Sequence, residues 1–181
     1  MTKGSVKGSN FEREICKKLS LWWSEDLRDD IFWRTSISGA RATTRSKKGQ
    51  GTSYSQGDVT FIDPVGKPFI AACLIEIKRG YTNEISVLDF IDRKRGEPLL
   101  WKWWRRLEKD RRQIRRKYSL LIFKRNQRRT CIMLDKEMWG EIIDYNGYFV
   151  GPLLNMNDLR IVNFNDFFEW VNPGFFKRDE K

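Results

Sequence analysis

Histidine is absent from the 181-residue sequence. Its absence excludes nucleases that bind metal through histidine, Ser-His-Asp hydrolases, zinc-type histidine clusters and any histidine general base. Acid–base chemistry in this chain would therefore fall to carboxylates, lysine, tyrosine, serine or metal-bound water.

Cysteine is scarce. The three cysteines, Cys16, Cys73 and Cys131, lie far apart in the chain and form no Cys-x-x-Cys pair. An odd number at such spacing argues against a disulfide framework and against a zinc site. We expect all three to be small core residues in a reducing, intracellular setting.

Long apolar runs are also missing. No stretch approaches the length of a membrane span, and the first residues, Met1 to Ser5, lack the apolar core of a signal peptide. We therefore expect no membrane partner and a cytoplasmic location, which would be the host cytoplasm if the protein is viral.

Positive charge is what the chain has in excess. Lysine and arginine number 35 against 24 aspartates and glutamates, which gives a formal net charge of +11. This excess fits a polyanionic partner, most simply nucleic acid, although a soluble protein can also be basic without such a partner. The hydrophobic content of 40% and the chain length predict one domain with a packed core.

The predicted elements alternate between helices and strands. Ser9-Asn10-Phe11-Glu12 has the form of a capping box and predicts a helix that starts there and ends before Glu25. The turn-like segment 64–68 predicts a hairpin that would bring Asp58 and Glu76 together across a ladder. Apolar, β-branched and aromatic runs predict strands at 31–35, 58–63, 69–78, 119–123 and 130–134, and apolar periodicity predicts helices at 98–117, 136–143 and 166–171.

The segment 37–56 is rich in serine, threonine, glycine, arginine and lysine and has almost no apolar side chains. We expect a long, flexible basic loop. Arg41, Arg45, Lys47 and Lys48 would make it a phosphate-contacting arm, and a dispensable disordered insertion fits the composition equally well.

The predicted helix 98–117 is amphipathic with a strongly basic outer face. Its apolar stripe contains several tryptophans, among them Trp103 and Trp104. Core packing explains such a stripe better than a base-stacking platform does. The Trp101–Trp104 cluster and the C-terminal aromatic residues are also candidates for a dimer contact, although core burial is the default.

A candidate site lies at the end of the predicted strand 69–78. Glu76 and Lys78 are two residues apart, so in a strand they project from the same face. With Asp58 beside them, the site would hold two hard oxygen ligands for a divalent metal and one cation, which suits metal-assisted phosphodiester hydrolysis. Taken alone, the Glu-x-Lys triplet is better explained as a charged strand end at the surface.

The ordered set of motifs resembles the PD-(D/E)xK nuclease superfamily, and within it the archaeal-type Holliday junction resolvases. The chain has a Gly-Ser-x-x-Glu-Arg-like helix start over residues 8–13, a Ser-Gly segment at 36–39, an acid at Asp58, and Glu76-Ile77-Lys78. The resemblance covers about residues 7–134. One departure is Gly57, where that family usually has proline; we expect glycine to allow the backbone shape that the proline position needs.

This resemblance implies an α/β fold with a restriction-endonuclease-like core, a central mixed β-sheet of about five strands flanked by helices. We expect a nuclease core over residues 1–135 and, over the unmatched residues 136–181, a C-terminal extension of the same domain. Asp58, Glu76 and the backbone carbonyl of Ile77 would bind Mg²⁺ or Mn²⁺. Whether Glu12 would bind the metal directly or through water is left open.

The remaining catalytic roles also follow from the resemblance. Lys78 would orient the attacking water or stabilise charge at phosphorus, and a lysine beside two carboxylates should stay charged. Ser38 would help to place the scissile strand. The DNA backbone would be held by basic residues outside the metal site: Arg13, Arg41, Arg45, Lys47, Lys48, Arg79, Arg105, Arg112 and Arg116.

We therefore expect a metal-dependent DNA endonuclease that resolves branched DNA as a homodimer and needs no small-molecule cofactor. Two alternatives stay open. One is a related nuclease that acts on other DNA, such as a restriction, nicking or single-strand-processing enzyme. The other is a basic nucleic-acid-binding protein with the same fold and no catalysis.

Overall fold

The computed structural model describes residues 3–35, 56–81, 84–86, 96–148, 151–156 and 158–178. None of the helices in these ranges is long and apolar enough to cross a membrane. The elements of this part of the chain are, in order, α1 Lys3–Trp23, β1 Phe32–Arg34, β2 Val59–Phe61, the 3-10 helix η1 Pro64–Gly66, α3 Lys67–Ala72, β3 Cys73–Arg79, α5 Leu99–Gln113, β4 Tyr118–Lys124, β5 Thr130–Asp135, α6 Lys136–Asn146, β6 Leu154–Met156, β7 Leu159–Asn163, α7 Phe164–Trp170 and α8 Gly174–Lys177.

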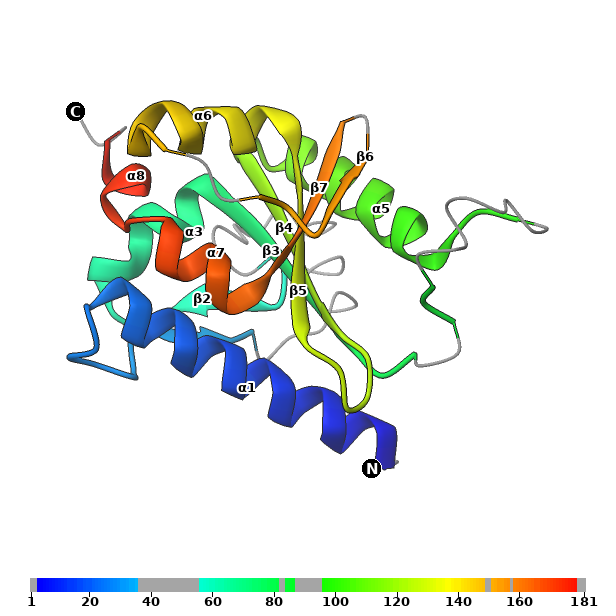
Figure 1. Ribbon diagram of the computed structural model, residues 1–181. Helices are drawn as coiled ribbons and strands as arrows, with labels where there is room; N and C mark the ends of the chain where they lie inside the picture. The colour runs from blue at the N-terminus through cyan, green and yellow to red at the C-terminus, as the bar shows by residue number, and fades with distance from the viewer. Residues whose placement is uncertain are drawn as a thin grey trace.

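A five-stranded mixed sheet forms the centre of the molecule (Figure 1). Its strand order is β3-β4-β5-β7-β6. Strands β3 and β4 are parallel, and the remaining neighbours are antiparallel. This confirms the predicted α/β class with a restriction-endonuclease-like core, a mixed sheet of about five strands flanked by helices.

Helices cover both faces of this sheet because the buried strands are apolar on both sides. Cys73, Ile75 and Ile77 of β3 face a cluster that also contains the buried side chains of α1, α3, α6, α7 and α8. Leu74, between them, points to the opposite face, where it packs with Leu100 and other residues of α5. The alternation places Glu76 and Lys78 on the same face as Leu74, toward α5.

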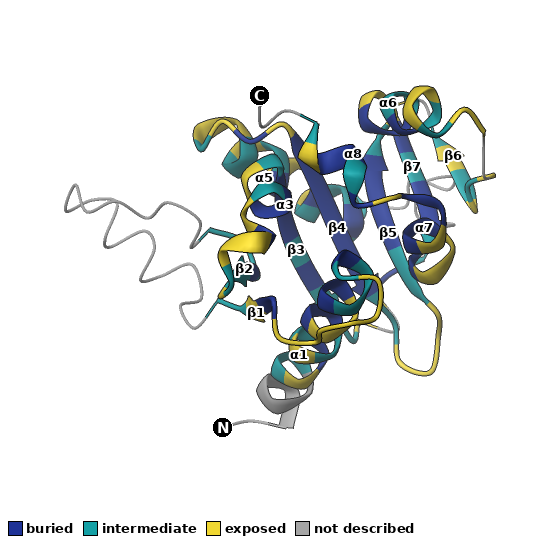
Figure 2. Ribbon diagram, turned by 90° about the vertical axis from the view of Figure 1, so that its left-hand side faces the viewer, coloured by how far each residue is buried: buried dark blue, intermediate teal, exposed yellow. Residues whose placement is uncertain are grey.

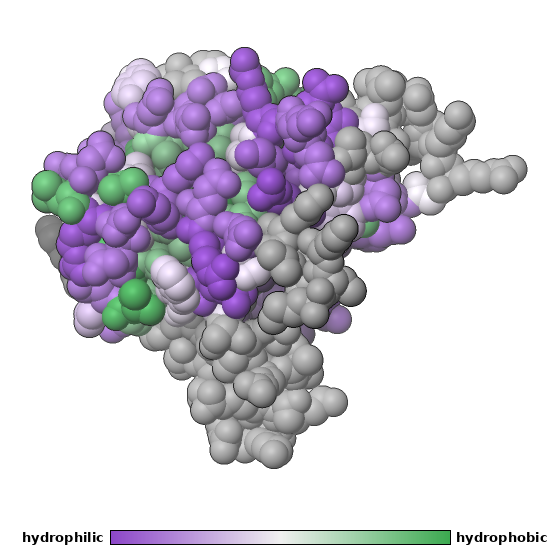
Figure 3. Space-filling model, turned by 90° about the horizontal axis from the view of Figure 1, so that it is seen from below, coloured by the Kyte–Doolittle hydropathy of each residue, from purple (hydrophilic) through white to green (hydrophobic). Residues whose placement is uncertain are grey.

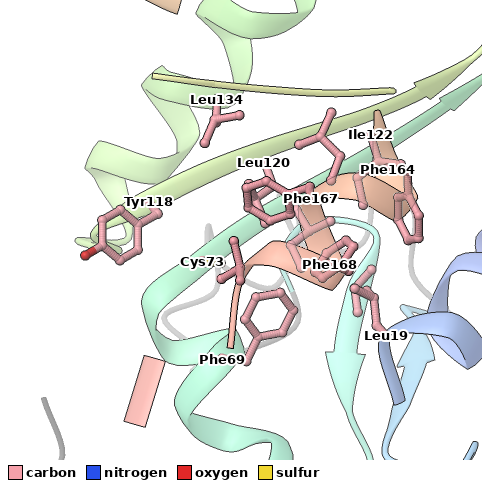
Figure 4. Packing of buried hydrophobic residues seen from close by; sticks show 14 of the residues in the cluster. Leu19, Phe69, Cys73, Tyr118, Leu120, Ile122, Leu134, Phe164, Phe167 and Phe168 are labelled. Atoms are coloured by element: carbon pink, nitrogen blue, oxygen red, sulfur yellow. The ribbon is translucent and has the colours of Figure 1, made fainter. Parts of the chain in front are cut away.

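The larger of the two apolar clusters is rich in aromatic rings. Phe69, Phe164, Phe167 and Phe168 converge on the strand residues of β3 and β4 (Figure 4). Strands β3 and β4 are buried along most of their length, whereas the outer surfaces of the helices are exposed (Figure 2). Seen from below, the described surface is mostly hydrophilic, with only small hydrophobic patches (Figure 3).

The predicted hairpin between 58–63 and 69–78 is wrong. Residues 69–72 belong to helix α3, and β2 pairs antiparallel with β1 in a separate two-stranded sheet. Local capping explains the difference. The Asp63 side chain accepts a hydrogen bond from the Val65 N–H at 2.9 Å, Pro64 opens η1, and Pro68 lies in the first turn of α3.

The first helix begins earlier than its capping-box sequence predicts. Helix α1 already starts at Lys3, so Ser9 and Glu12 lie within it. The Glu12 side chain therefore does not cap the helix start. Its apolar stripe is as predicted, because Phe11, Ile15 and Leu19 are all fully buried.

The C-terminal segment supplies two strands that were not predicted. Strand β7 pairs with β5, and β6 pairs with β7. The predicted number of strands in the central sheet was therefore right, but two of the predicted strands are not part of it. The predicted strands 31–35 and 58–63 correspond to β1 and β2 of the small sheet. Because β7 extends the central sheet and α7 packs in the same core, we propose that residues 136–181 belong to one domain with the rest.

The cysteines behave largely as expected. All three are free; Cys16 and Cys73 are buried, and Cys131 is half-buried. Burial, reinforced by the negative charges of Glu12 and Asp58, raises the pKa of the Cys16 thiol to about 12. A thiol of this kind is not a reactive nucleophile at neutral pH.

Candidate active site

Asp58 lies against the edge of β3 opposite its partner strand β4, just before β2 begins. Its backbone N–H donates to the Ile75 carbonyl at 2.8 Å, and its Oδ2 accepts from the Ile77 N–H at 2.7 Å. The structure thus brings Asp58 beside Glu76-Ile77-Lys78, although by a route other than a hairpin. Residue Asp58 is fixed on both sides of Glu76, by its backbone N–H on Ile75 and by its carboxylate on Ile77.

Gly57 makes this close approach to β3 feasible. Its φ is +83°, and a Cβ at this position would lie 2.7 Å from the Ile75 carbonyl oxygen and 2.9 Å from Leu74 Cδ1. A proline ring fixes φ near −65°, so Gly57 does not reproduce a proline backbone shape, contrary to our expectation. Glycine is needed here both for its conformation and for its lack of a side chain.

Glu76 and Lys78 project together, as their spacing predicts. The Lys78 Nζ forms an ion pair and a hydrogen bond with Glu76 Oε1. Their side chains are 29% and 24% exposed, respectively, so both can be reached from solvent. The pair lies on the face of the sheet that α5 covers.

The two carboxylates Asp58 and Glu76 are only partly neutralised by the single positive charge of Lys78. Burial and then the negative charge of Glu76 raise the pKa of Asp58 to about 7, against the opposing effects of Lys78 and the Ile77 N–H. Burial opposes the charge on Lys78, but Glu76 and Asp58 outweigh it and raise the pKa of this lysine. Lys78 is therefore a cation at neutral pH.

Glu12 stands slightly apart from this group. Its Oε2 is 3.2 Å from Arg34 Nη1, and its charge contributes weakly to the raised pKa of Asp58. Within the described ranges no three histidine, cysteine, aspartate or glutamate side chains come together as a potential metal-binding group. Glu12 is thus near the site but is not grouped with Asp58 and Glu76.

Arg34 and Thr35 were missed by the sequence analysis. Arg34 at the end of β1 pairs with Glu12 on α1, and the Thr35 hydroxyl donates to the Gly57 carbonyl at 2.7 Å. The Thr35 N–H also donates to the Asp58 carbonyl at 3.0 Å. The only signal in the sequence was a charged residue, Arg34, in a short strand rich in aromatic residues. That signal does not reveal that its partner is Glu12, 22 positions earlier.

The predicted DNA-contacting residues lie in several different parts of the chain. Arg13, which follows Glu12 on α1, is exposed, and the guanidinium of Arg79, which follows Lys78 on β3, is 5.5 Å from the centre of the Phe11 ring. Arg105 and Arg112 are exposed on α5 and pair with Glu97 and Glu108. Ser38, Arg41, Arg45, Lys47 and Lys48 lie outside the described residues.

The structure corrects the predicted DNA-contacting role of Arg116. It is buried, and its Nη1 donates to the Cys73 carbonyl at 2.9 Å, at the start of β3. Helix α5 ends at Gln113, and Arg115 adopts a φ of +59°. Arg116 therefore leaves the helical spacing that placed it on the basic face, and it supports the strand instead of facing DNA.

Comparison with protein-family models identifies the chain. Residues 3–175 match the family described as "Phage putative PDDEXK endonuclease". The chain belongs to this PD-(D/E)xK endonuclease family. No curated protein and no solved structure matches it.

The match extends from α1 into α8 and so includes the C-terminal segment, which the resemblance over 7–134 left out. Membership of an endonuclease family makes the protein a nuclease of the PD-(D/E)xK type and implies a DNA substrate. The family description names an endonuclease and no particular DNA structure.

Proposed function

We propose that this protein is a divalent-metal-dependent DNA endonuclease whose metal is held by Asp58 and Glu76. The observation that carries the proposal is the anchoring of the Asp58 carboxylate on the Ile77 N–H, directly beside Glu76 and Lys78. The geometry of β3 alone places Glu76 and Lys78 together, but it does not bring in Asp58, which comes from a different segment of the chain.

The residues fit a hard divalent cation. Asp58 and Glu76 offer carboxylate oxygens, and the Ile77 carbonyl is a further candidate ligand. The raised pKa of Asp58 reflects two partly buried carboxylates that one lysine does not neutralise. Bound Mg²⁺ or Mn²⁺ would supply a water of lowered pKa and polarise the phosphate.

Lys78 has the properties of a charge stabiliser. A lysine whose pKa is raised cannot accept a proton near neutral pH, so it is unsuited to act as a general base. Its ammonium can instead position the attacking water or offset the charge that develops on the phosphate. The ion pair with Glu76 holds it beside the acids before substrate binds.

Glu12 and Ser38 complete the proposed site in supporting roles. Arg34 holds the Glu12 carboxylate near Asp58, where it can assist metal binding through a water. Ser38 would help to place the scissile strand. Arg13 and Arg79, on α1 and β3, and the arginines of α5 are candidates for contacts with the DNA backbone.

We further propose branched DNA, cut by a homodimer, as the substrate. The support is the ordered motif set Glu12, Ser38, Asp58, Glu76 and Lys78 together with the net charge of +11. A closed two-fold dimer would place two cuts symmetrically about a junction. An endonuclease that acts on other DNA is the second candidate, because the family description specifies no junction.

The test uses four-way, nicked, flapped and linear duplex DNA, each with EDTA, Mg²⁺ or Mn²⁺. Glu76→Gln and Lys78→Met should each lower cleavage by about 100-fold or more, whereas binding in EDTA should stay within a few-fold. Lys117→Met, far from the site, is the matched control. Undiminished cutting by both site variants would refute the mechanism.

Substrate and assembly are tested in the same preparation. Preferential cutting of the four-way junction and a dimeric mass by light scattering would support resolution of junctions. Preference for linear duplex of one sequence would reject it and favour the second candidate. A metal effect on stability provides an independent check, because Mg²⁺ should raise the melting temperature of the wild type more than that of Glu76→Gln.

A further inference from the structure

Two aromatic side chains pair beside the candidate site, on the face of the sheet that α5 covers. The rings of Tyr81 and Trp103 have centroids 4.8 Å apart and an interplanar angle of 72°. Tyr81 is 43% exposed, and Trp103 is half-buried on α5. An edge-to-face contact leaves at least one face of each ring uncovered by the other.

The backbone holds Tyr81 in place at some conformational cost. Gly80 and Tyr81 have φ values of +102° and +53°, and a left-handed conformation is uncommon for a residue with a side chain. The Gly80 N–H donates to the Lys124 carbonyl at 3.0 Å. The Tyr81 carbonyl accepts from the N–H groups of Glu84 and Ile85, both at 3.1 Å, and Ile85 is buried in the core.

Tyr81 is close to the proposed catalytic lysine. It lies three residues beyond Lys78 and adds a weak electrostatic contribution to the environment of that ammonium, after burial, Glu76 and Asp58. Burial of apolar area does not explain the position, because nearly half of the Tyr81 side chain stays in solvent. The partly exposed ring thus lies just beyond the end of β3 that carries Lys78.

Positive charge lies near the pair on α5. Lys102 and Arg106 are exposed on this helix, next to Trp103 and one turn beyond it, and the Arg106 side chain is 80% exposed. Arg79 and Lys124 lie over the Phe11 ring, on the opposite face of the sheet, and do not contribute to this surface. Exposed rings among cations are the pattern of surfaces that stack nucleobases while contacting phosphates.

We propose that Tyr81, supported by Trp103, stacks on an unpaired nucleobase next to the scissile phosphate. Paired bases inside a continuous duplex have both faces covered, so the ring would have nothing to stack on there. The inference rests on the proposed function and sharpens it. The substrate class would be DNA with unpaired bases at the cutting point, as at a fork, gap or strained junction.

The experiment measures binding without cleavage. Forked DNA carries one 2-aminopurine at each of the first four unpaired positions in turn, and a fully paired duplex serves as reference, all in EDTA. Stacking quenches this fluorescent base. Tyr81→Leu should lose the quenching at the responsive position and bind the fork about tenfold more weakly, with binding to the duplex within twofold of wild type.

Two further variants control for the change. Tyr81→Phe keeps a ring and should behave as wild type. Tyr148→Leu removes a tyrosine that is 55% exposed, slightly more than Tyr81; it follows α6, where its carbonyl accepts from Trp170 Nε1, and the change should alter neither readout. Because Tyr81 is exposed, the melting temperature of Tyr81→Leu should match that of the wild type.

Several outcomes would overturn the inference. Equal weakening on fork and duplex would make Tyr81 a general backbone contact, and no effect on either would remove it from the DNA surface. A lower mass of Tyr81→Leu in light scattering would make the pair an interface between copies of the chain. If the wild type cuts no DNA in Mg²⁺ or Mn²⁺, the proposed nuclease activity fails, whichever result the binding assay gives.

Discussion

The two ends of the parallel strand pair β3–β4 carry acidic residues in contrasting electrostatic surroundings. At the starting end, Glu141 accepts hydrogen bonds from Lys117 Nζ at 2.9 Å and from the Tyr118 hydroxyl at 2.8 Å, and it also pairs with Arg178. Burial opposes its charge, but these three donors outweigh it and lower the pKa of Glu141. The surroundings of Glu141 therefore stabilise its negative charge.

At the finishing end, Asp58 is placed beside another carboxylate. Burial and Glu76 raise the pKa of Asp58 to about 7, which means that the folded protein disfavours its charge. A fold shaped only by stability would not keep this arrangement, whereas a site that awaits a cation and a phosphate requires it. From this contrast we propose that Glu141 serves the structure and that Asp58 serves the nuclease site.

The largest expected effect separates the two acids by activity. Asp58→Asn should lower cleavage by at least about 100-fold, because it removes a charged ligand while keeping the shape and the acceptor for the Ile77 N–H. Glu141→Gln should leave cleavage within a few-fold of wild type. Initial rates on the preferred substrate in saturating Mg²⁺ give the comparison, and a comparable loss in Glu141→Gln would contradict the assignment.

The backbone that delivers Asp58 provides the next test. Gly57→Ala should destabilise the protein by about 3 kcal/mol and reduce cleavage, because a Cβ would collide with the Ile75 carbonyl and the φ of +83° is unfavourable. Urea unfolding and initial rates are the measurements.

Gly147 offers a matched control for this change. It has a similar φ of +72° at the end of α6, but a Cβ there meets no atom within 4 Å. Gly147→Ala should therefore cost only about 1 kcal/mol and leave cleavage unchanged. Equal losses of stability in the two variants would mean that the close approach to β3 is unimportant.

The sequence predicted the local part of the site better than its assembly. Glu76 and Lys78 could be placed on one face because strand spacing alone determines it. The arrival of Asp58 beside them was expected from a hairpin that does not exist. The apolar residues 69–72 suit a strand, but Asp63, Pro64 and Pro68 start helical turns there.

The features that sequence reasoning missed depend on contacts between distant segments. Arg34 and Glu12 are 22 residues apart, and no periodicity links β1 to α1. Strand β6 contains only three residues, and Arg160 interrupts the apolar residues of β7, so neither strand has a continuous apolar run. Arg116 was misplaced because the sequence does not reveal that α5 ends at Gln113.

Stability should respond to the two acids in opposite directions. At pH 8 in EDTA, Asp58→Asn should raise the free energy of unfolding by on the order of 2 kcal/mol, because the disfavoured charge is removed. Glu141→Gln should lower it by about 1 kcal/mol, since a partly exposed ion-pair network loses its anion. Urea unfolding of both variants and the wild type measures the difference, and a change of the same sign in both would break the contrast.

A further effect is the pH dependence of the Asp58 contribution. In the unfolded chain this carboxyl titrates near its ordinary pKa of 3.8, whereas in the folded protein it titrates near 7. Between these values the folded state holds a proton that the unfolded state has released. The stability from protonated Asp58 is thus fully present below the lower value and is lost as the pH rises through about 7.

The advantage of Asp58→Asn over the wild type should therefore grow from pH 5 to pH 7 and level off above it. The slope cannot exceed about 1.4 kcal/mol per pH unit, because one proton is involved. Urea unfolding of both proteins in EDTA at pH 5, 6, 7 and 8 gives this difference, in which titrating groups that do not interact with Asp58 cancel. An advantage independent of pH would show that Asp58 is already charged throughout, and the raised pKa would no longer distinguish it from Glu141.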